Sequence, residues 1–148
     1  MASPLPIDAV QTLSGLDLLT GLAEGRFPPP PFAETTGCRL VAVEHGRATF
    51  AGRPSERFLN PLGLVHGGWT AGILDSALGC AVHTTLPAGQ AFSTIEMKVH
   101  LVRAVRPGDG ELTCEGRVVH RGGQVATAEA YLRDAAGHIR LLLSEYTK

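Results

Sequence analysis

A long apolar segment with a single charge in its middle places the strongest limit on how this chain can fold. Between Gly67 and Val82, Asp75 is the one charged residue. We predict a helix of about five turns over residues 67–86, which begins at its two glycines and ends before Pro87 because proline cannot continue a helix. A helix that is apolar on nearly all sides is buried, so the rest of the chain has to surround it.

Short β-rich segments on both sides of this helix predict a sheet that covers it. Residues 39–43 and 47–52 are typical of a hairpin that turns at His45-Gly46. Further strands are predicted near residues 92–105, 110–121, 124–133 and 138–147, with Pro, Gly and Asp turn signals between them. Strands joined by short turns, together with one buried helix, predict an antiparallel sheet wrapped around that helix, an α+β fold.

The N-terminal part of the chain has a different pattern. Apolar residues at mostly helical intervals predict one amphipathic helix over residues 6–24, which ends at Gly25. Four prolines at residues 28–31 predict a stiff, extended connector. We therefore divide the chain into an N-terminal helix with a Pro-rich connector, residues 1–36, and an α+β domain, residues 37–148.

The composition argues against several classes of protein. The chain of 148 residues has 13 Lys and Arg against 14 Asp and Glu, which does not favour a nucleic-acid-binding surface. No segment approaches the roughly 18 consecutive apolar residues of a membrane-spanning helix. The three cysteines are dispersed and the six histidines lack the spacing of metal ligands. We expect a cytoplasmic protein that uses no metal and no cofactor, and that binds neither nucleic acid nor a membrane.

Asp75 is the first candidate for a functional residue. A buried carboxylate is costly without a partner, so the sequence has to supply hydrogen-bond donors or a function for it. Three of its four neighbours on the same helix face are small, which leaves room for another backbone or a ligand. These neighbours are Ala71, Gly72, Leu78 and Gly79. The structural alternative is a carboxylate capped by a nearby hydroxyl, such as Thr70 or Ser76, or paired across an interface.

The segment before the predicted helix is the second candidate. Residues 60–68 are rich in turn formers and present the free N–H groups of Gly67 and its successors at a helix N-terminus. Such donors, at the positive end of the helix dipole, can hold an oxygen that becomes anionic during acyl transfer. The alternative is that the Gly67-Gly68 pair only permits a tight turn and that His66 packs or caps the helix.

Taken together, Asn60, the sequence His66-Gly67-Gly68, and Asp75 nine residues after the histidine resemble the active-site signature of hotdog-fold acyl-CoA thioesterases. The resemblance is to the phenylacetate-degradation branch, which is also similar to 4-hydroxybenzoyl-CoA thioesterase of the Arthrobacter type. It extends over residues 37–148. It implies a long helix wrapped by an antiparallel sheet, the hotdog fold, and self-association into dimers or tetramers with each active site at the dimer interface.

The resemblance also implies a role for each residue of the signature. The Gly67 N–H would polarise the thioester carbonyl, and the partner subunit's Asp75 would act as a general base on water or as a nucleophile. Asn60 would orient that water or the carboxylate. His66 would help to position the carbonyl or the loop.

A hydroxyl that assists the water is implied at the start of the next strand. Ser93 and Thr94 both lie there, and Thr94 is preferred because residues 94–97 resemble the pattern of the family, a hydroxyl, an aliphatic residue, an acid and Met. The chain departs from the Arthrobacter type, which has Glu at the acid position and Thr one turn later. Here these positions hold Asp75 and Gly79, so the choice between base and nucleophile stays open.

Contacts to the rest of the substrate are less constrained by the sequence. Arginine pairs with phosphate through charge-assisted hydrogen bonds, although solvated strand faces explain most of the basic residues equally well. The candidates for substrate or CoA binding are Gly68, Ser93, Arg103 and Arg121. Trp69, Phe58 and Phe92 are candidates either for an acyl pocket or for ordinary core packing.

These observations predict an acyl-CoA thioesterase that hydrolyses the thioester to a free acid and CoA. CoA is part of the substrate, and the acyl group, aromatic or medium-chain, is left open. Two alternatives are a hotdog hydratase or dehydratase and a non-catalytic module that binds acyl-CoA.

Overall fold

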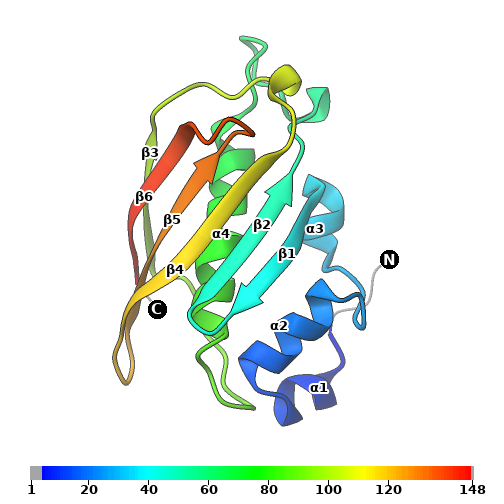
Figure 1. Cartoon of the computed structure of the whole chain (residues 1–148), viewed down its shortest axis with the longest axis vertical. Coiled ribbons are helices and arrows are strands. Elements are labelled where there is room, and N and C mark those ends of the chain that lie inside the picture. The colour runs from blue at the N-terminus through cyan, green and yellow to red at the C-terminus, as the bar shows by residue number, and fades with distance from the viewer. Residues whose placement is uncertain (1–4, 148) are drawn as a thin grey trace.

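One antiparallel sheet of six strands forms the body of the protein (Figure 1). The computed structural model describes residues 5–147, of which residues 140–147 are described by their backbone alone. In spatial order the strands are β1 (Cys38–Glu44), β2 (Arg47–Gly52), β4 (Leu112–Arg121), β5 (Ala126–Arg133), β6 (Ile139–Thr147) and β3 (Glu96–Leu101). All neighbouring strands pair antiparallel. The predicted α+β fold class is confirmed.

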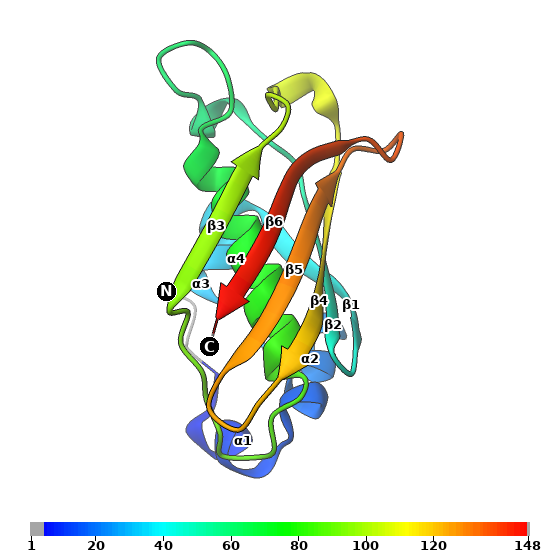
Figure 2. The same cartoon turned by 90° about the vertical axis from the view of Figure 1, so that its left-hand side faces the viewer.

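The predicted buried helix, α4 (Gly67–His83), lies along one face of this sheet (Figures 1 and 2). Ile73, Leu74, Ala77 and Leu78 are completely buried. The helix ends three residues earlier than expected because the chain tightens into a turn there, with Leu86 N–H bonded to His83 O at 2.9 Å.

A glycine in the sheet allows α4 to approach closely. A Cβ at Gly116 of β4 would lie 2.6 Å from the carbonyl carbon of Ala77 and 2.9 Å from Leu78 N. Ordinary contacts between carbon atoms are about 3.5–4.0 Å long. The helix that carries Asp75 is therefore seated on the sheet at a point where only glycine fits.

The prediction of one N-terminal helix was wrong. The structure has α1 (Ile7–Thr12) and α2 (Gly15–Ala23), separated by two extended residues. The break occurs because Ser14 caps a new helix: its Oγ accepts a hydrogen bond from Asp17 N–H at 3.1 Å.

A further short helix, α3 (Pro31–Thr36), was not predicted. It begins at the last of the four prolines, since proline has no N–H to lose at the first helical position. It ends at Gly37, whose φ of 70° is left-handed. Two single-turn 3-10 helices, η1 (Glu56–Phe58) and η2 (Pro107–Asp109), lie in the longer loops.

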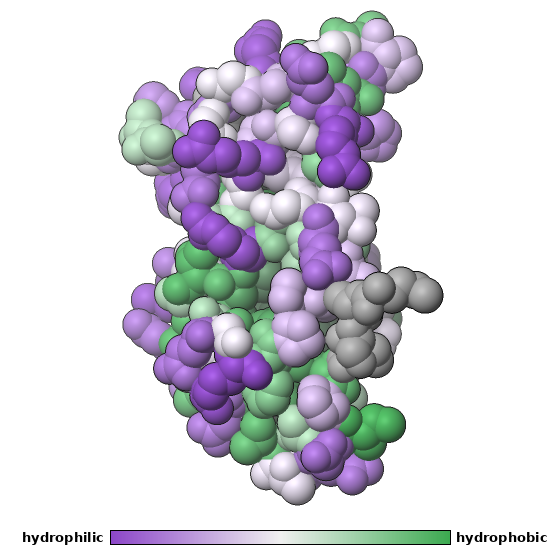
Figure 3. All heavy atoms as spheres, turned by 90° about the vertical axis from the view of Figure 1, so that its right-hand side faces the viewer, coloured by the Kyte–Doolittle hydropathy of each residue, from purple (hydrophilic) through white to green (hydrophobic). Residues whose placement is uncertain are grey.

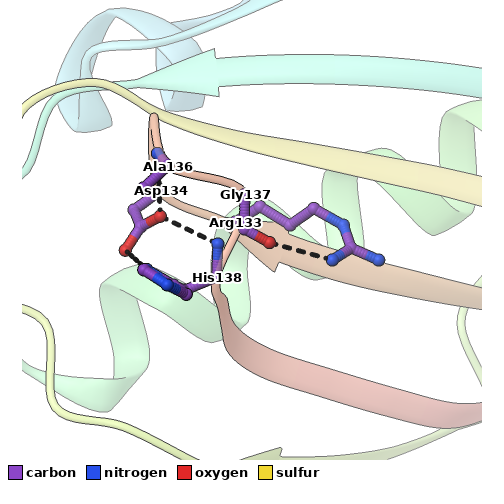
Figure 4. Close-up of polar contacts among 5 residues, drawn as sticks. All are labelled: Arg133, Asp134, Ala136, Gly137 and His138. Atoms are coloured by element: carbon purple, nitrogen blue, oxygen red, sulfur yellow. Dashed lines mark hydrogen bonds and ion pairs between the residues drawn. The ribbon is translucent and has the colours of Figure 1, made fainter.

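The hairpin turns predicted between β1 and β2, between β4 and β5, and between β5 and β6 are present. The β1–β2 turn has Gly46 at φ 77°. In the β5–β6 turn, Asp134 Oδ1 accepts hydrogen bonds from Ala136 N–H at 3.0 Å and from His138 N–H at 2.9 Å (Figure 4). A carboxylate that satisfies two backbone donors fixes a tight turn without help from the core.

Strand β3 is shorter than the predicted segment, residues 92–105. The chain leaves the sheet after Leu101, and Val105 O instead accepts a hydrogen bond from Val65 N–H, at 3.0 Å, in the loop before α4. Within the described residues β3 pairs with β6 alone, so it forms a free edge of the sheet (Figure 2).

Candidate active site

Asn60 builds the loop that leads into α4. Its side-chain Oδ1 accepts hydrogen bonds from Leu62 N–H at 2.9 Å and from Leu64 N–H at 3.2 Å, and its own N–H donates to Leu64 O at 2.8 Å. With Oδ1 used in this way, the amide Nδ2 is the group left for a substrate, and no bond of Nδ2 is found among residues 5–147. Asn60 can therefore donate a hydrogen bond to a carbonyl, a water or a carboxylate.

His66 caps the start of α4. Its Nδ1 accepts a hydrogen bond from Gly68 N–H at 2.8 Å, so this nitrogen carries no proton and the ring of a neutral His66 carries its proton on Nε2. The side chain is exposed. The capping role that the sequence left open is present, and it leaves the Nε2–H as an outward donor. The Gly68 N–H, in contrast, is already bonded.

Gly67 is the first residue of α4, where a backbone N–H has no partner within the helix. No acceptor for this N–H is found in the part of the chain that the structure describes. It lies at the positive end of the helix dipole. Asn60, Gly67 and Arg103 line one hollow of about 260 Å³, so the structure brings these three predicted residues together.

Asp75 lies two turns further along α4 and is half-buried rather than fully buried. Thr94 Oγ1 donates a hydrogen bond to Asp75 Oδ1 at 2.9 Å. Thr70 and Ser76, the hydroxyls of the capping alternative, instead donate to carbonyl oxygens of the helix backbone. The preferred hydroxyl, Thr94, is thus the one beside the carboxylate.

A cavity of about 400 Å³ opens beside Asp75 and Thr94. Four of the five phenylalanines line it, namely Phe27, Phe32, Phe50 and Phe92. Gly79, one turn after Asp75, also lines the cavity and adds no side chain to it. The arrangement is a carboxylate at the edge of an apolar, aromatic space, which suits the acyl part of a thioester.

Cys80 lies in the same wall of the cavity. Burial, and secondarily the charge of Asp75, raises the pKa of the Cys80 thiol to about 12. The thiol is therefore neutral near pH 7 and is not a nucleophile, since the thiolate is the reactive form.

The two halves of the predicted site lie far apart within one chain. Gly67 and Asp75 are eight residues apart on one helix, which corresponds to about 12 Å along its axis. A hydrogen bond spans about 3 Å. One carbonyl cannot contact the Gly67 N–H and the carboxylate of the same protomer.

The remaining candidates have different positions. Ser93 is exposed next to Thr94. Arg121 ends β4 at the hairpin to β5, and Figure 1 shows this hairpin at the opposite end of the molecule from the loop that leads into α4. The structure therefore does not bring Arg121 to the Gly67 end of the site.

The aromatic candidates divide between cavity and core. Phe92 lines the cavity. Trp69 is buried, and its ring lies tilted against that of Phe58, with 6.1 Å between the ring centroids. Its indole N–H donates a hydrogen bond to Thr36 O at 3.0 Å. Trp69 thereby joins α4 to the end of α3.

Sequence reasoning did not identify the N-terminal wall of the cavity. Phe27 and Phe32 come from the segment that was interpreted as a connector. Two phenylalanines on either side of a proline run were the available signal, because large apolar residues in a stiff segment need a surface to pack on.

Two further features of residues 5–147 bear on function. They contain no group of three or more His, Cys, Asp and Glu side chains that is placed to hold a metal ion. Among the helices in this range, none combines the length and the apolar character required to cross a lipid bilayer.

Comparison with known proteins identifies the class. Residues 62–139 match the thioesterase superfamily, and the chain belongs to this family. A phenylacetic acid degradation-related protein of Ralstonia eutropha JMP134 is 26% identical, with a TM-score of 0.78 over 87% of this chain and 97% of that chain. These findings confirm the resemblance to hotdog-fold thioesterases of the phenylacetate-degradation branch.

Two other relatives extend the comparison. The protein SSO2140 of Saccharolobus solfataricus, whose suggested activity is that of an esterase, is 29% identical over 68% of this chain and 70% of its own length. The protein smu.793 of Streptococcus mutans UA159, solved with acetyl-CoA bound, is 19% identical. It has a TM-score of 0.66 over 73% of this chain and 84% of that chain. At this identity, the similarity to smu.793 is evidence for the fold alone.

Proposed function

We propose that the protein is an acyl-CoA thioesterase in which Asp75 drives hydrolysis of the thioester to a free acid and CoA. One observation carries the proposal: the Asp75 carboxylate accepts a hydrogen bond from the Thr94 hydroxyl and lies at the edge of an apolar cavity. The helix that carries it lies within the segment that matches the thioesterase superfamily. The acetyl-CoA bound to the Streptococcus mutans protein supports a CoA ester as the substrate. The three free cysteines agree with a cytoplasmic setting.

Each active site is proposed to use two copies of the chain. The separation of about 12 Å along α4 keeps the Gly67 N–H away from Asp75 of the same protomer, so in this proposal it meets the partner subunit's Asp75. The free edge at β3 supports pairing with a second copy, because an unpaired strand edge is a template for another strand. Large apolar side chains are exposed where β3 ends: Leu101 is 62% exposed and Val102 is 63% exposed. Their burial would favour a dimer or a tetramer.

The proposed reaction follows from the free groups of the site. Thr94 occupies Asp75 Oδ1, which leaves Oδ2 to take a proton from water as that water attacks the thioester carbonyl carbon. The carbonyl oxygen becomes anionic and accepts hydrogen bonds from the Gly67 N–H and the His66 Nε2–H. The C–S bond then breaks, the thiolate of CoA takes up the proton, and the acid is released. In the nucleophilic route, Asp75 attacks first and water hydrolyses the resulting anhydride.

Two other roles are less well supported. A hydratase or dehydratase commonly needs a histidine and an acid at one carbon atom, whereas His66 Nδ1 is used to cap α4. A module that only binds acyl-CoA would not need a carboxylate at the edge of the cavity.

The test of the acid is Asp75→Asn, assayed by release of CoA from a panel of acyl-CoAs with a thiol reagent. We expect kcat to fall by about 10²–10⁴-fold. Asp8→Asn is the matched control, because Asp8 is exposed on α1, and its rate should equal that of the wild type. An Asp75→Asn protein with the wild-type rate would overturn the assignment of Asp75 as the catalytic acidic residue. A wild type that binds acyl-CoA without turnover would overturn the proposal that the protein is an enzyme.

The test of the oxyanion donor is Gly67→Pro, which deletes the N–H while keeping the helix, because the first helical position accepts proline. His66 before it is extended, with ψ 134°, as a residue before proline prefers. Gly67→Ala is the control, because it keeps the N–H. The expected loss in kcat for the proline variant is about 10²–10³-fold; equal rates for both variants would refute the role.

Mixing the two inactive variants tests the shared site. In hybrids of Asp75→Asn and Gly67→Pro, one of the two sites combines an intact donor with an intact acid. Random mixing should restore about a quarter of the wild-type activity, because half of the dimers are hybrids with one intact site of two. No recovery in proven hybrids, or an active monomer in sedimentation, would contradict a site made from two chains.

A further inference from the structure

Phe32 separates the cavity beside Asp75 from a second hollow. That hollow has a volume of about 360 Å³ and is lined by His66, Gly68 and Trp69 at the start of α4. Among the residues whose side chains the structure describes, Phe32 is the one that lines both spaces. Its ring therefore stands as a partition between the hollow at the start of α4, where His66 lies, and the cavity beside the Asp75 carboxylate.

The ring rests on a glycine of α4. A Cβ at Gly72 would lie 2.7 Å from Phe32 Cζ, so the tip of the ring meets the helix backbone directly. Gly72 is three residues before Asp75 and lies on the same helix face. Of the small residues that flank Asp75, Gly79 opens onto the cavity, whereas the space at Gly72 is filled by this ring.

The ring of Phe32 is free to rotate, although the α3 backbone that carries it is fixed. Phe32 is 51% exposed, so rotation of its ring costs less buried apolar area than movement of a core residue would. The backbone below it is constrained by Pro30 and Pro31. At the far end of α3, Thr36 is buried and its carbonyl accepts the Trp69 indole N–H at 3.0 Å. The Phe32 side chain can therefore move while the backbone of α3 stays in place.

The surrounding surface agrees with an apolar ligand. Figure 3 views the molecule from the side of the N-terminal helices and shows apolar residues gathered in the lower half of this face, where α1 and α2 lie (Figure 1). Leu22 and Phe27, from α2 and the segment after it, line the cavity. The N-terminal segment therefore contributes the outer wall of the space beside Asp75.

We propose that Phe32 determines specificity by limiting how long an acyl chain the enzyme accepts. With the ring on Gly72, the space for the acyl group ends at about 400 Å³. Without the ring, the second hollow joins it and adds about 360 Å³ along α4. This inference rests on the proposed thioesterase function and assigns its substrates: acyl groups that end at Phe32 are accepted, and longer chains are rejected.

The experiment measures kcat/KM for straight-chain acyl-CoAs from acetyl to palmitoyl with the wild type, Phe32→Ala and Gly72→Ala. Phe32→Ala removes the partition, and Gly72→Ala displaces it. The ratio of kcat/KM for long over short chains should rise at least about tenfold in Phe32→Ala, because one methylene in an apolar pocket already changes specificity by about 10-fold or more. It should rise in Gly72→Ala as well. Ile7→Ala is the control, since Ile7 is 75% exposed on α1 and lines neither space; its ratio should not change.

The outcomes separate this inference from the proposed function. Hydrolysis with an unchanged chain-length profile in both variants overturns the partition alone. An equal loss for all chain lengths in Phe32→Ala also overturns it, because the residue would then only support the fold. If the wild type hydrolyses no acyl-CoA, the proposed function fails. Calorimetry of the same acyl-CoAs, with the Asp75→Asn protein and the Phe32→Ala, Asp75→Asn double variant, then tests the partition by binding. Only the double variant should gain affinity for the longer chains.

Discussion

The seat of α4 on the sheet can be tested by adding one methyl group. In Gly116→Ala the new Cβ would lie 2.6 Å from the Ala77 carbonyl carbon, so the helix and β4 have to separate by about 1 Å to reach an ordinary contact. Overpacking of this kind costs about 1–3 kcal/mol, and a contact between two backbones belongs at the upper end. The lower entropy of the unfolded alanine chain returns about 0.4–1 kcal/mol.

The expected net loss is therefore about 2 kcal/mol in the free energy of unfolding. For a chain of this length it corresponds to a fall in Tm of about 4–8 °C. Trp69 is the single tryptophan and is buried on α4, so its fluorescence during urea unfolding, at fixed protein concentration, reports the change. Because Ala77 is two residues after Asp75, we also expect kcat to fall at least tenfold, since a 1 Å displacement of a catalytic group can cost about 10²-fold.

Gly123→Ala is the matched control. Gly123 has no atom within 4 Å of a built Cβ and no left-handed φ. The same substitution should change stability there by less than about 0.5 kcal/mol. Equal stability and equal kcat for Gly116→Ala and Gly123→Ala would show that α4 does not contact β4 closely enough to exclude a methyl group.

Three further predictions concern thiols, the entry loop and the α3–α4 link. Burial raises the pKa of all three cysteine thiols, that of Cys80 to about 12, so the thiols stay protonated at pH 8. We expect the native protein to react slowly with a thiol reagent, and all three thiols to react after unfolding in guanidinium. Fast reaction of the native protein would contradict this. Asn60→Ala leaves two loop N–H groups without an acceptor, and we expect a loss of about 1–3 kcal/mol in urea unfolding together with a lower kcat; an unchanged midpoint and rate would count against it. Trp69→Phe leaves Thr36 O without its donor and should cost a similar amount, measured by circular dichroism, whereas a neutral result would show that water replaces the bond.

The central helix and most strands could be predicted because the apolar pattern of each element depends on its own burial and not on the identity of its neighbours. The segment around Asp75 is apolar whichever neighbour covers it, and the turns at Gly46 and Asp134 are fixed by local chemistry. The break at Ser14 was missed because the apolar spacing continues across it while a single cap restarts the helix. The early end of β3 was missed because Val105 pairs with a loop that is distant in sequence.

The site was predicted unevenly for the same physical reason. Asp75 was predicted from its position as the single charge in an apolar helix, and the resemblance added Thr94; these two side chains are hydrogen-bonded to each other. The cavity beside them depends on long-range packing, since Phe27 and Phe32 reach it from a segment that precedes the sheet. No local pattern indicates which surface a phenylalanine next to prolines will cover.

The cavity wall and the residues proposed for the chemistry come from different parts of the chain. Asp75 and Gly67 belong to α4, whereas Leu22, Phe27 and Phe32 belong to the N-terminal segment. Under the proposed roles, reactivity and selectivity are thus encoded in separate stretches of the gene. Exchange of residues 22–33 between related proteins is expected to transfer acyl preference while the chemistry is inherited unchanged, so new substrates can be acquired without rebuilding the active site.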